Sequence, residues 1–215
     1  MKFLNILCDQ PDSFFLDYLD DVDKIARKNG WKMFFANEVE NIRHGDLLIA
    51  ASARSVLSEM DLLKNKRNAV IHPSLLPNYK GSGVLAWSIV EGASAVSVTS
   101  FEPNNQIDAG PIIFQTTREL TGFELNQELR SIQACQYLEH INFLCSENWY
   151  SIPQENVCSK IYPKRNKKHS ELDINKTILE QFNLLRVVDN DKYPAFFLHG
   201  GRKYVIKIYE FVSEL

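Results

Sequence analysis

The sequence predicts an α/β fold: an open, mostly parallel twisted sheet with helices on both faces, plus a small C-terminal α+β appendage. Strand-like and helix-like segments alternate along most of the chain, which is typical of parallel strands joined by helical crossovers. Several strand-like segments are short continuous apolar runs, as expected for strands that are buried on both faces. The 215 residues are 45% hydrophobic and 24% charged, an ordinary globular composition with enough length for a substantial core.

The chain opens in βαβ order. Residues 2–8 form an apolar run that predicts a strand, and residues 13–29 have helical spacing that ends at the stop signal Asn29-Gly30. Residues 32–36 predict a second strand. Two strands joined through a helix indicate the start of a parallel sheet.

The same alternation continues through the next hundred residues. Apolar or β-rich runs predict strands at residues 47–51, 69–72, 95–101 and 111–117, and helical spacing predicts helices at residues 56–63, 84–91 and 124–148. In the helix at residues 56–63, Leu57, Met60 and Leu63 would share one apolar side.

The character of the chain changes past Tyr150. Prolines and basic residues mark a linker or boundary there, namely Pro153, Pro163, Lys164, Arg165, Lys167 and Lys168. We therefore predict a main domain over residues 1–150 and a small C-terminal α+β subdomain over residues 151–215. The subdomain is expected to hold one helix and one hairpin: residues 175–187, N-capped by Asp173 or Asn175, and residues 195–199 with 203–208 around Gly200-Gly201.

Composition and charge argue against several classes of protein. A formal net charge of -3 offers no electrostatic surface for nucleic acid. No apolar run approaches the roughly 20 residues of a membrane helix, and the first residues lack the long apolar region of a signal peptide. We therefore expect a cytoplasmic protein that binds neither nucleic acid nor membrane. The four cysteines form no CxxC pair, so we predict no metal cluster.

Two loops carry the residues of most chemical interest. In an open α/β sheet, ligands bind beyond the carboxyl ends of the strands. His72 ends a predicted strand and is followed by the rigid Pro73, while Asp108 stands shortly before Gly110 and the next strand. Together they could form an acid–base pair. Taken singly, a histidine is more often a hydrogen-bonded structural residue, and an aspartate before a glycine is more often a turn residue.

The combined pattern resembles a known family signature. The motif HxSLLPxxxG begins at His72, and DxGxI begins at Asp108; this combination is similar to the signature of folate-dependent formyltransferases. Parts of the subdomain resemble the second domain of the sugar and tRNA enzymes in that family: Tyr162-Pro-Lys-Arg165, Glu171-Leu-Asp-Ile174, Phe182-Asn-Leu-Leu-Arg186 and Tyr193-Pro-Ala-Phe196. Because this subdomain is small and only mildly basic, the resemblance is nearest to the nucleotide-sugar N-formyltransferases.

The resemblance implies a formyltransferase-like fold and an acyl-transfer reaction. The enzyme would move the formyl group of N10-formyltetrahydrofolate, a cosubstrate, to the amine of a small nucleotide-linked amino sugar, without a metal. His72 would donate toward the formyl oxygen, and Asp108 would orient His72 and relay the proton of the amine. The implied folate-binding residues are Ala53, Arg54, Val56, Leu57, Gln106 and Ile107, and the implied acceptor-side residues are Ser74, Lys80 and Gly81. Val56 and Leu57 could instead be helix core, and Lys80 could face solvent.

One departure from the family pattern leaves alternatives open. The family usually carries an asparagine two residues before the histidine, whose amide shares the oxyanion, whereas this chain has Val70. A backbone amide, Asn104, Asn105 or water would then have to contribute, because Asn68 lies too far along the strand. A hydrolase of formyltetrahydrofolate and a catalytically silent folate or sugar-nucleotide binding module remain alternatives. The apolar residues 209–212 would allow a homodimer contact.

Overall fold

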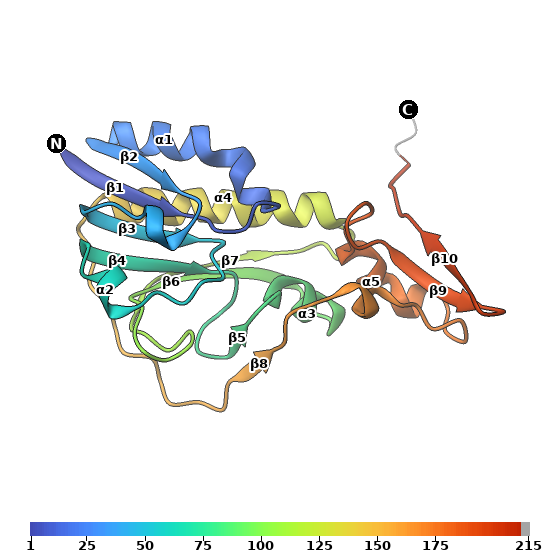
Figure 1. Cartoon of the computed structure of the whole chain (residues 1–215). Coiled ribbons are helices and arrows are strands. Elements are labelled where there is room, and N and C mark those ends of the chain that lie inside the picture. The colour runs from blue at the N-terminus through green and yellow to red at the C-terminus, as the bar shows by residue number, and fades with distance from the viewer. Residues whose placement is uncertain (212–215) are drawn as a thin grey trace.

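The computed structural model describes residues 1–211 and is built on a six-stranded sheet with the strand order β2-β1-β3-β4-β6-β7 (Figure 1). The strands are β1 Lys2–Leu7, β2 Trp31–Ala36, β3 Gly45–Ala51, β4 Asn65–His72, β6 Ala95–Phe101 and β7 Ile112–Glu119. The first four pair in parallel, whereas β6 runs antiparallel to both β4 and β7. The sheet is thus mostly parallel, as predicted, with one reversed strand near an edge.

Helices cover both faces of this sheet. They are α1 Leu19–Lys28, α2 Glu59–Leu62, α3 Val84–Val90, α4 Asn126–Cys145 and α5 Phe182–Val187, with 3-10 turns at Phe14–Tyr18, Val39–Asn41, Lys167–Ser170 and Leu179–Gln181. Helices α1 and α4 contact each other on one side of the sheet, and α2 and α3 lie on the other side (Figure 1). The expectation of helices on both faces is confirmed.

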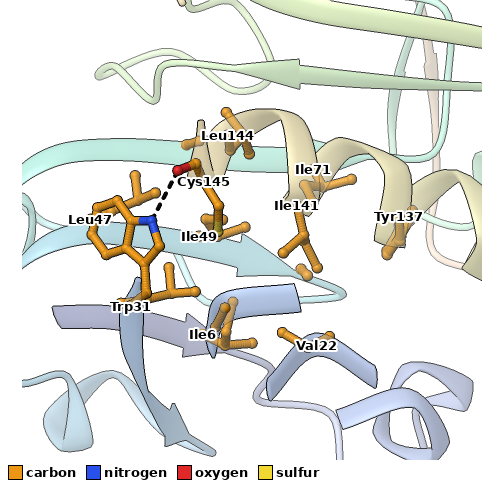
Figure 2. Packing of buried hydrophobic residues seen from close by; sticks show 14 of the residues in the cluster. Ile6, Val22, Trp31, Leu47, Ile49, Ile71, Tyr137, Ile141, Leu144 and Cys145 are labelled. Carbon is orange, nitrogen blue, oxygen red and sulfur yellow. Dashed lines mark hydrogen bonds between the residues drawn. The ribbon is translucent and has the colours of Figure 1, made fainter. Parts of the chain in front are cut away.

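The main core lies between the sheet and the α1–α4 layer (Figure 2). Ile6, Ile49 and Ile71 from three neighbouring strands meet Tyr137 and Ile141 of α4 there, and all five are buried. Because side chains alternate along a strand, the neighbours of Ile71 in β4 point to the opposite face. Those neighbours are Val70 and His72, so the second face of the sheet carries the candidate site.

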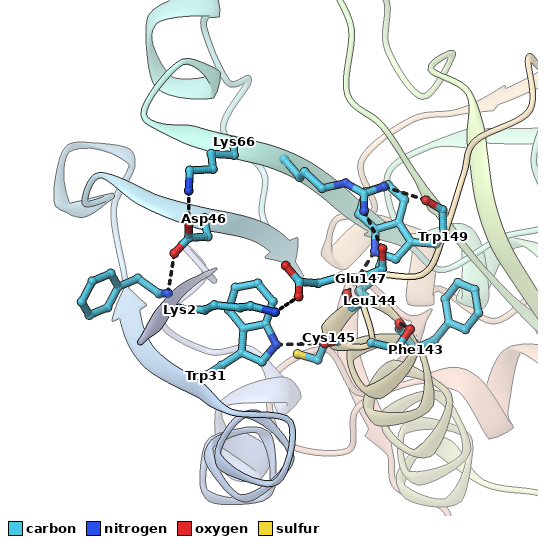
Figure 3. Close-up of polar contacts among 12 residues, drawn as sticks. Lys2, Trp31, Asp46, Lys66, Phe143, Leu144, Cys145, Glu147 and Trp149 are labelled. Carbon is cyan, nitrogen blue, oxygen red and sulfur yellow. Dashed lines mark hydrogen bonds and ion pairs between the residues drawn. The ribbon is translucent and has the colours of Figure 1, made fainter.

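The carboxyl end of α4 is fixed to the starting ends of the strands (Figure 3). The indole of Trp31 donates to the carbonyl of Cys145 at 2.9 Å, and Lys2 pairs with Glu147. Arg67 of β4 donates to the carbonyls of Glu147 and Trp149 at 3.0 and 2.8 Å. The chain therefore leaves α4 from a defined position at one end of the sheet.

The segment after α4 then returns along the main domain. Ile152 forms an antiparallel bridge with Ile112 of β7, and β8 Lys160–Tyr162 pairs in parallel with β5 Tyr79–Gly81. Beyond β8, α5 and the hairpin of β9 Ala195–His199 and β10 Arg202–Ile206 share a small core of their own. The division of the chain at residue 150 stays a prediction, although the residues that come immediately after it remain attached to the main domain.

Several elements differ from the sequence-based expectation. Residues 56–63 form only one helical turn, since Ser58 caps α2 through reciprocal bonds with Asp61, and Met60 and Leu63 are exposed rather than packed on one side. The C-terminal helix α5 begins at Phe182, after the 3-10 turn Leu179–Gln181, instead of at residue 175, because the Asp173 carboxylate accepts from the backbone of Asn175 in a turn. The short pair β5–β8 was not expected.

The residues predicted to allow a dimer contact lie at the end of the chain. Tyr209 and Phe211 are exposed, whereas Val212 lies outside the described residues. The homodimer therefore stays a prediction.

Candidate active site

His72 is the last residue of β4 and is only 7% exposed. Its Nδ1 lies 3.6 Å from Oδ1 of Asp108, close but beyond hydrogen-bond distance, and its buried Nε2 has no hydrogen-bond partner among residues 1–211. Burial lowers the pKa of His72 below its ordinary value, opposed by the Asp108 carboxylate and by the carbonyl of Tyr79. The imidazole is therefore neutral near pH 7, with its buried Nε2 unpartnered.

Asp108 reaches His72 from the loop between β6 and β7. Because β6 runs antiparallel to β4 and its last residue, Phe101, pairs with Val70, this loop starts beside β4 before His72 rather than beyond the carboxyl end of the strand. The loop then runs on the side of the sheet where α2 and β5 lie (Figure 1). The Oδ2 atom of Asp108 accepts from the backbone N–H of Gly81 at 2.9 Å. This bond joins the two loops that carry the family signature.

The same loop has a tightly constrained backbone. Asp108 has a φ of 48°, in the left-handed region that few non-glycine residues adopt. A Cβ on Gly110 would lie 1.6 Å from the carbonyl oxygen of Glu102, so only glycine fits there. The backbone N–H of Glu102 also donates to the carbonyl of Pro111 at 2.9 Å, which closes the base of the loop. These contacts restrict the position of the Asp108 carboxylate.

The loop after His72 is held from β6 and β7. The buried hydroxyl of Thr99 donates to the carbonyl of Ser74 at 2.7 Å and accepts from the amide of Leu76 at 3.2 Å. Gln115 donates to Thr99 and to the carbonyl of Leu76 at 2.9 and 2.8 Å. The Ser74 hydroxyl donates to the carbonyl of Tyr79 at 2.5 Å. Ser74 therefore shapes the loop from within, and Thr99 and Gln115 are supports that the sequence did not reveal.

The residues expected to bind folate lie on two loops, and most are accessible. Val56 and Ile107 are 85% and 72% exposed, and Gln106 is also exposed. Ala53 and Leu57 are half-buried and pack with Val70 on the site face of the sheet. Neither Val56 nor Leu57 lies in a helix, so the helix-core alternative is wrong. These apolar side chains would suit a flat heteroaromatic ring.

The backbone donors near Arg54 are already engaged. The amides of Arg54 and Ser55 donate to the carboxylate of Asp9 at 2.8 and 2.7 Å. Partial burial raises the pKa of Asp9, but the Ser55 side chain and then these two amides lower it below its ordinary value. Asp9 thereby fixes the shape of the loop after β3. A ligand of this loop would meet its apolar side chains and its remaining amides instead.

Gly81, which donates to Asp108, follows Lys80, and Arg165 lies beside Gly83, two residues further along the chain. Lys80 is half-buried, and Gly81 has no room for a Cβ, which would lie 2.3 Å from the carbonyl oxygen of Tyr162. The guanidinium of Arg165 lies 5.2 Å from the ring of Trp87, and its buried Nη1 has no hydrogen-bond partner among residues 1–211. Burial, and then the positive charge of Arg130, lower the pKa of Arg165.

A mostly parallel α/β sheet with a buried histidine and a carboxylate at a strand end defines a candidate acid–base centre. Residues 31–141, just over half of the chain, match the family described as Formyl transferase. The chain belongs to the formyl transferase family. The match starts earlier than the signature alone indicated and includes both His72 and Asp108.

Relatives and solved structures of several kinds resemble the chain. The methionyl-tRNA formyltransferase of Flavobacterium psychrophilum is 29% identical over 153 residues, which cover 67% of this chain and 48% of that protein. The chain thus spans about half the length of the curated relatives it matches.

Several solved structures share the fold. The methionyl-tRNA formyltransferase from Clostridium thermocellum has a TM-score of 0.80 at 14% identity, covering 99% of this chain and 94% of that one. A 4-N formyltransferase from Francisella tularensis has 0.75 at 19% identity, covering 98% and 99%. HypX from Aquifex aeolicus, in complex with tetrahydrofolic acid, has 0.69 at 17% identity, covering 97% and 37%.

Two features are absent from the described part of the chain. Residues 1–211 contain no group of three or more His, Cys, Asp or Glu side chains that could hold a metal ion. No helix among them has both the length and the apolar character needed to span a membrane.

Proposed function

We propose that this chain is an N-formyltransferase that transfers the formyl group of N10-formyltetrahydrofolate to the amine of a nucleotide-linked amino sugar. The observation that carries this proposal is the buried His72–Asp108 pair at the end of β4, within a chain of the formyl transferase family. The fold shared with a structure that binds tetrahydrofolic acid supports the choice of carrier.

The two side chains can move the protons that the reaction requires. In a neutral His72 with its proton on Nδ1, facing Asp108, the lone pair of the unpartnered Nε2 would be available to the substrate. His72 would take the proton released by the attacking amine, and the nearby carboxylate would stabilise the resulting imidazolium. The imidazolium could then return a proton to the departing nitrogen. The 3.6 Å separation can shorten when substrates close the site.

The folate loops fit the carrier by their surface chemistry. N10-formyltetrahydrofolate would supply the formyl carbon, while the exposed Val56 and Ile107 would cover its flat ring. Asp9 holds the loop after β3 in place through two amides. These residues would thus orient the carrier next to His72 without a rearrangement of the sheet.

The acceptor side favours a small molecule with phosphates. Arg130 and Arg165 make no ion pair within residues 1–211, and Arg165 keeps one buried N–H group unpartnered. The side chain of Arg165 lies beside Gly83, two residues after the amide that holds Asp108. A diphosphate on these guanidinium groups would satisfy them and leave the attached sugar near the acid–base pair.

A direct assay tests the function. The chain is incubated with N10-formyltetrahydrofolate and, separately, nucleotide-linked 3-amino and 4-amino sugars, the same sugars without the nucleotide, and methionyl-tRNA. Mass spectrometry should show one added formyl group on a nucleotide-linked sugar only. Asp108→Asn should lower kcat by about 10²–10⁴-fold, because it removes the charge that stabilises the imidazolium.

The control for this assay is Asp17→Asn, which changes an exposed carboxylate without a contact to the site. Formylation of methionyl-tRNA alone would overturn the proposed acceptor. Release of formate in the absence of any amine would favour the hydrolase. Folate binding without any formyl transfer would favour the silent binding module, the alternative that Val70 suggests.

A further inference from the structure

Gln154 contacts the loop that carries Asp108 from a distant part of the chain. It lies in the irregular segment between α4 and β8, and its side chain is half-buried. Its Nε2 donates to the carbonyl oxygen of Asp108 at 3.0 Å and to that of Gly110 at 2.7 Å. Both hydrogens of the amide are therefore used, which also determines which way the amide is turned.

The two carbonyl groups belong to the most constrained part of the β6–β7 loop. Asp108 is left-handed, and Gly110 is pressed against the backbone of Glu102. A loop in this conformation cannot pair its carbonyls within a sheet, so donors must come from elsewhere. Gln154 supplies them for the residues on either side of Ala109.

The segment that carries Gln154 is itself anchored on both sides. Before it, Trp149 is bound by Arg67 of β4, and Ile152 exchanges two backbone hydrogen bonds with Ile112 at 2.7 and 2.8 Å. After it, β8 pairs with β5. An amide on such a fixed backbone loses little freedom when it bonds the loop, so it can define the position of Asp108.

Asp108 is thus held at two points. The backbone N–H of Gly81 fixes its carboxylate, and Gln154 fixes its main chain. Gly81 is in turn backed by Tyr162 of β8. Both restraints depend on the stretch of chain that comes after α4.

We propose that Gln154 is a positioning residue that sets the distance between Asp108 and His72. The catalytic part of this inference rests on the proposed function, whereas the geometric part concerns the two side chains alone. Gln154 touches neither reacting group; it acts through the backbone of Asp108.

The test replaces Gln154 with methionine, which has nearly the same length but no N–H donor. Glu155→Met is the matched control, since Glu155 is the exposed neighbour and its side chain makes no contact with the site. Gln154→Met should lower kcat about 10–100-fold, while the KM for each substrate changes less than about threefold, because positioning rather than binding is lost. Glu155→Met should keep the parent kcat.

A second readout needs no activity. In an NMR titration of the His72 ring, Asp108→Asn should lower the pKa, because the carboxylate raises it in the parent protein. Gln154→Met should lower the pKa in the same direction, and the double variant should add little to Asp108→Asn alone. Inactivity of the parent chain on every acceptor would count against the proposed function only. An unchanged pKa in Gln154→Met, even with a lower melting temperature, would overturn the positioning role.

Discussion

At the scale of the residue, Val70 is where the site departs most clearly from its family pattern. It stands on the same face of β4 as His72 and packs, half-buried, against the cluster that contains Leu7 and Ala50. Asn68 does not replace the missing donor, since its amide donates to the carbonyl of Leu62. Asn104 and Asn105 are exposed on the β6–β7 loop, where the Oδ1 atom of Asn104 accepts from the backbone of Gln106. Without that amide, the oxyanion would depend on backbone N–H groups, on the loop amides and, once His72 has taken up the proton of the amine, on its imidazolium.

Restoring the asparagine tests this interpretation. If the missing amide limits catalysis, Val70→Asn should raise kcat by up to about 10²-fold, the contribution of one oxyanion donor. It should also cost about 1–2 kcal/mol of stability, because a partly buried amide replaces an apolar group. Steady-state kinetics and denaturant unfolding check the two effects. Val70→Ala is the control, and an equal gain in kcat from Val70→Ala would contradict the explanation.

At the scale of the element, the β6–β7 loop is the structure on which the acid–base pair depends. Gly110→Ala should distort this loop, because the new Cβ would lie 1.6 Å from the carbonyl oxygen of Glu102 and would force the two backbone segments apart. We expect a loss of about 2 kcal/mol or more in the free energy of unfolding, together with a fall in kcat as Asp108 moves.

The matched control is Gly92→Ala, where nothing lies within 4 Å of the added Cβ. Gly92 has a φ of 94°, so alanine there should cost about 1 kcal/mol through the backbone alone and leave kcat unchanged. Equal effects of both substitutions on kcat would contradict the role assigned to Gly110.

The elements that could be predicted from sequence are those with a signal of their own. The buried strand β3 contains a continuous apolar run and β6 is rich in β-branched residues, and the positions of both were confirmed almost to the residue. The predicted helix at residues 56–63 is longer than the observed α2, because the cap at Ser58 overrides the apolar spacing around it. The three-residue strands β5 and β8 have no pattern, since each is extended only because the other lies beside it.

The residues of the candidate site also differ in whether the sequence could predict them. His72 and Asp108 could be found because they lie within a long motif, and the structure brings them together. Gln154 could not, because a single amide in an irregular segment has no periodicity and its partner carbonyls are 46 and 44 positions away in sequence. The reversed direction of β6, which decides the path of the Asp108 loop, is likewise set by pairing rather than by composition.

At the scale of the whole molecule, buried histidines make stability depend on pH. His140 is fully buried, with Nδ1 2.6 Å from the Ser100 hydroxyl and Nε2 3.0 Å from that of Thr116. Burial, and then the charge of Arg118, lower its pKa to about 3. The unfolded chain therefore binds a proton that the folded one does not as pH falls below about 6.5, and the stabilisation present above that pH is lost toward pH 3.

The measurable consequence is the slope of the free energy of unfolding against pH. Between about pH 7 and pH 5, His140 alone should remove about 2 kcal/mol from the free energy of unfolding, at about 1.4 kcal/mol per pH unit below its unfolded pKa. His140→Gln should flatten the pH dependence by that amount in urea unfolding at the two pH values. His199→Gln, at an exposed position, should keep the parent slope. If His140→Gln changed the free energy of unfolding by the same amount at both pH values, the titration of His140 would not be the cause of the pH dependence.

The path of the chain after α4 limits how this protein could be recombined with its relatives. Residues 147–162 contact in turn Arg67, Ile112, Asp108 and finally β5, so they support the candidate site although they precede the C-terminal hairpin in sequence. A chimera that exchanged the predicted C-terminal subdomain at Tyr150 would import a foreign support for Asp108. A junction placed just after Tyr162 would keep that support native and exchange only the residues beyond β8.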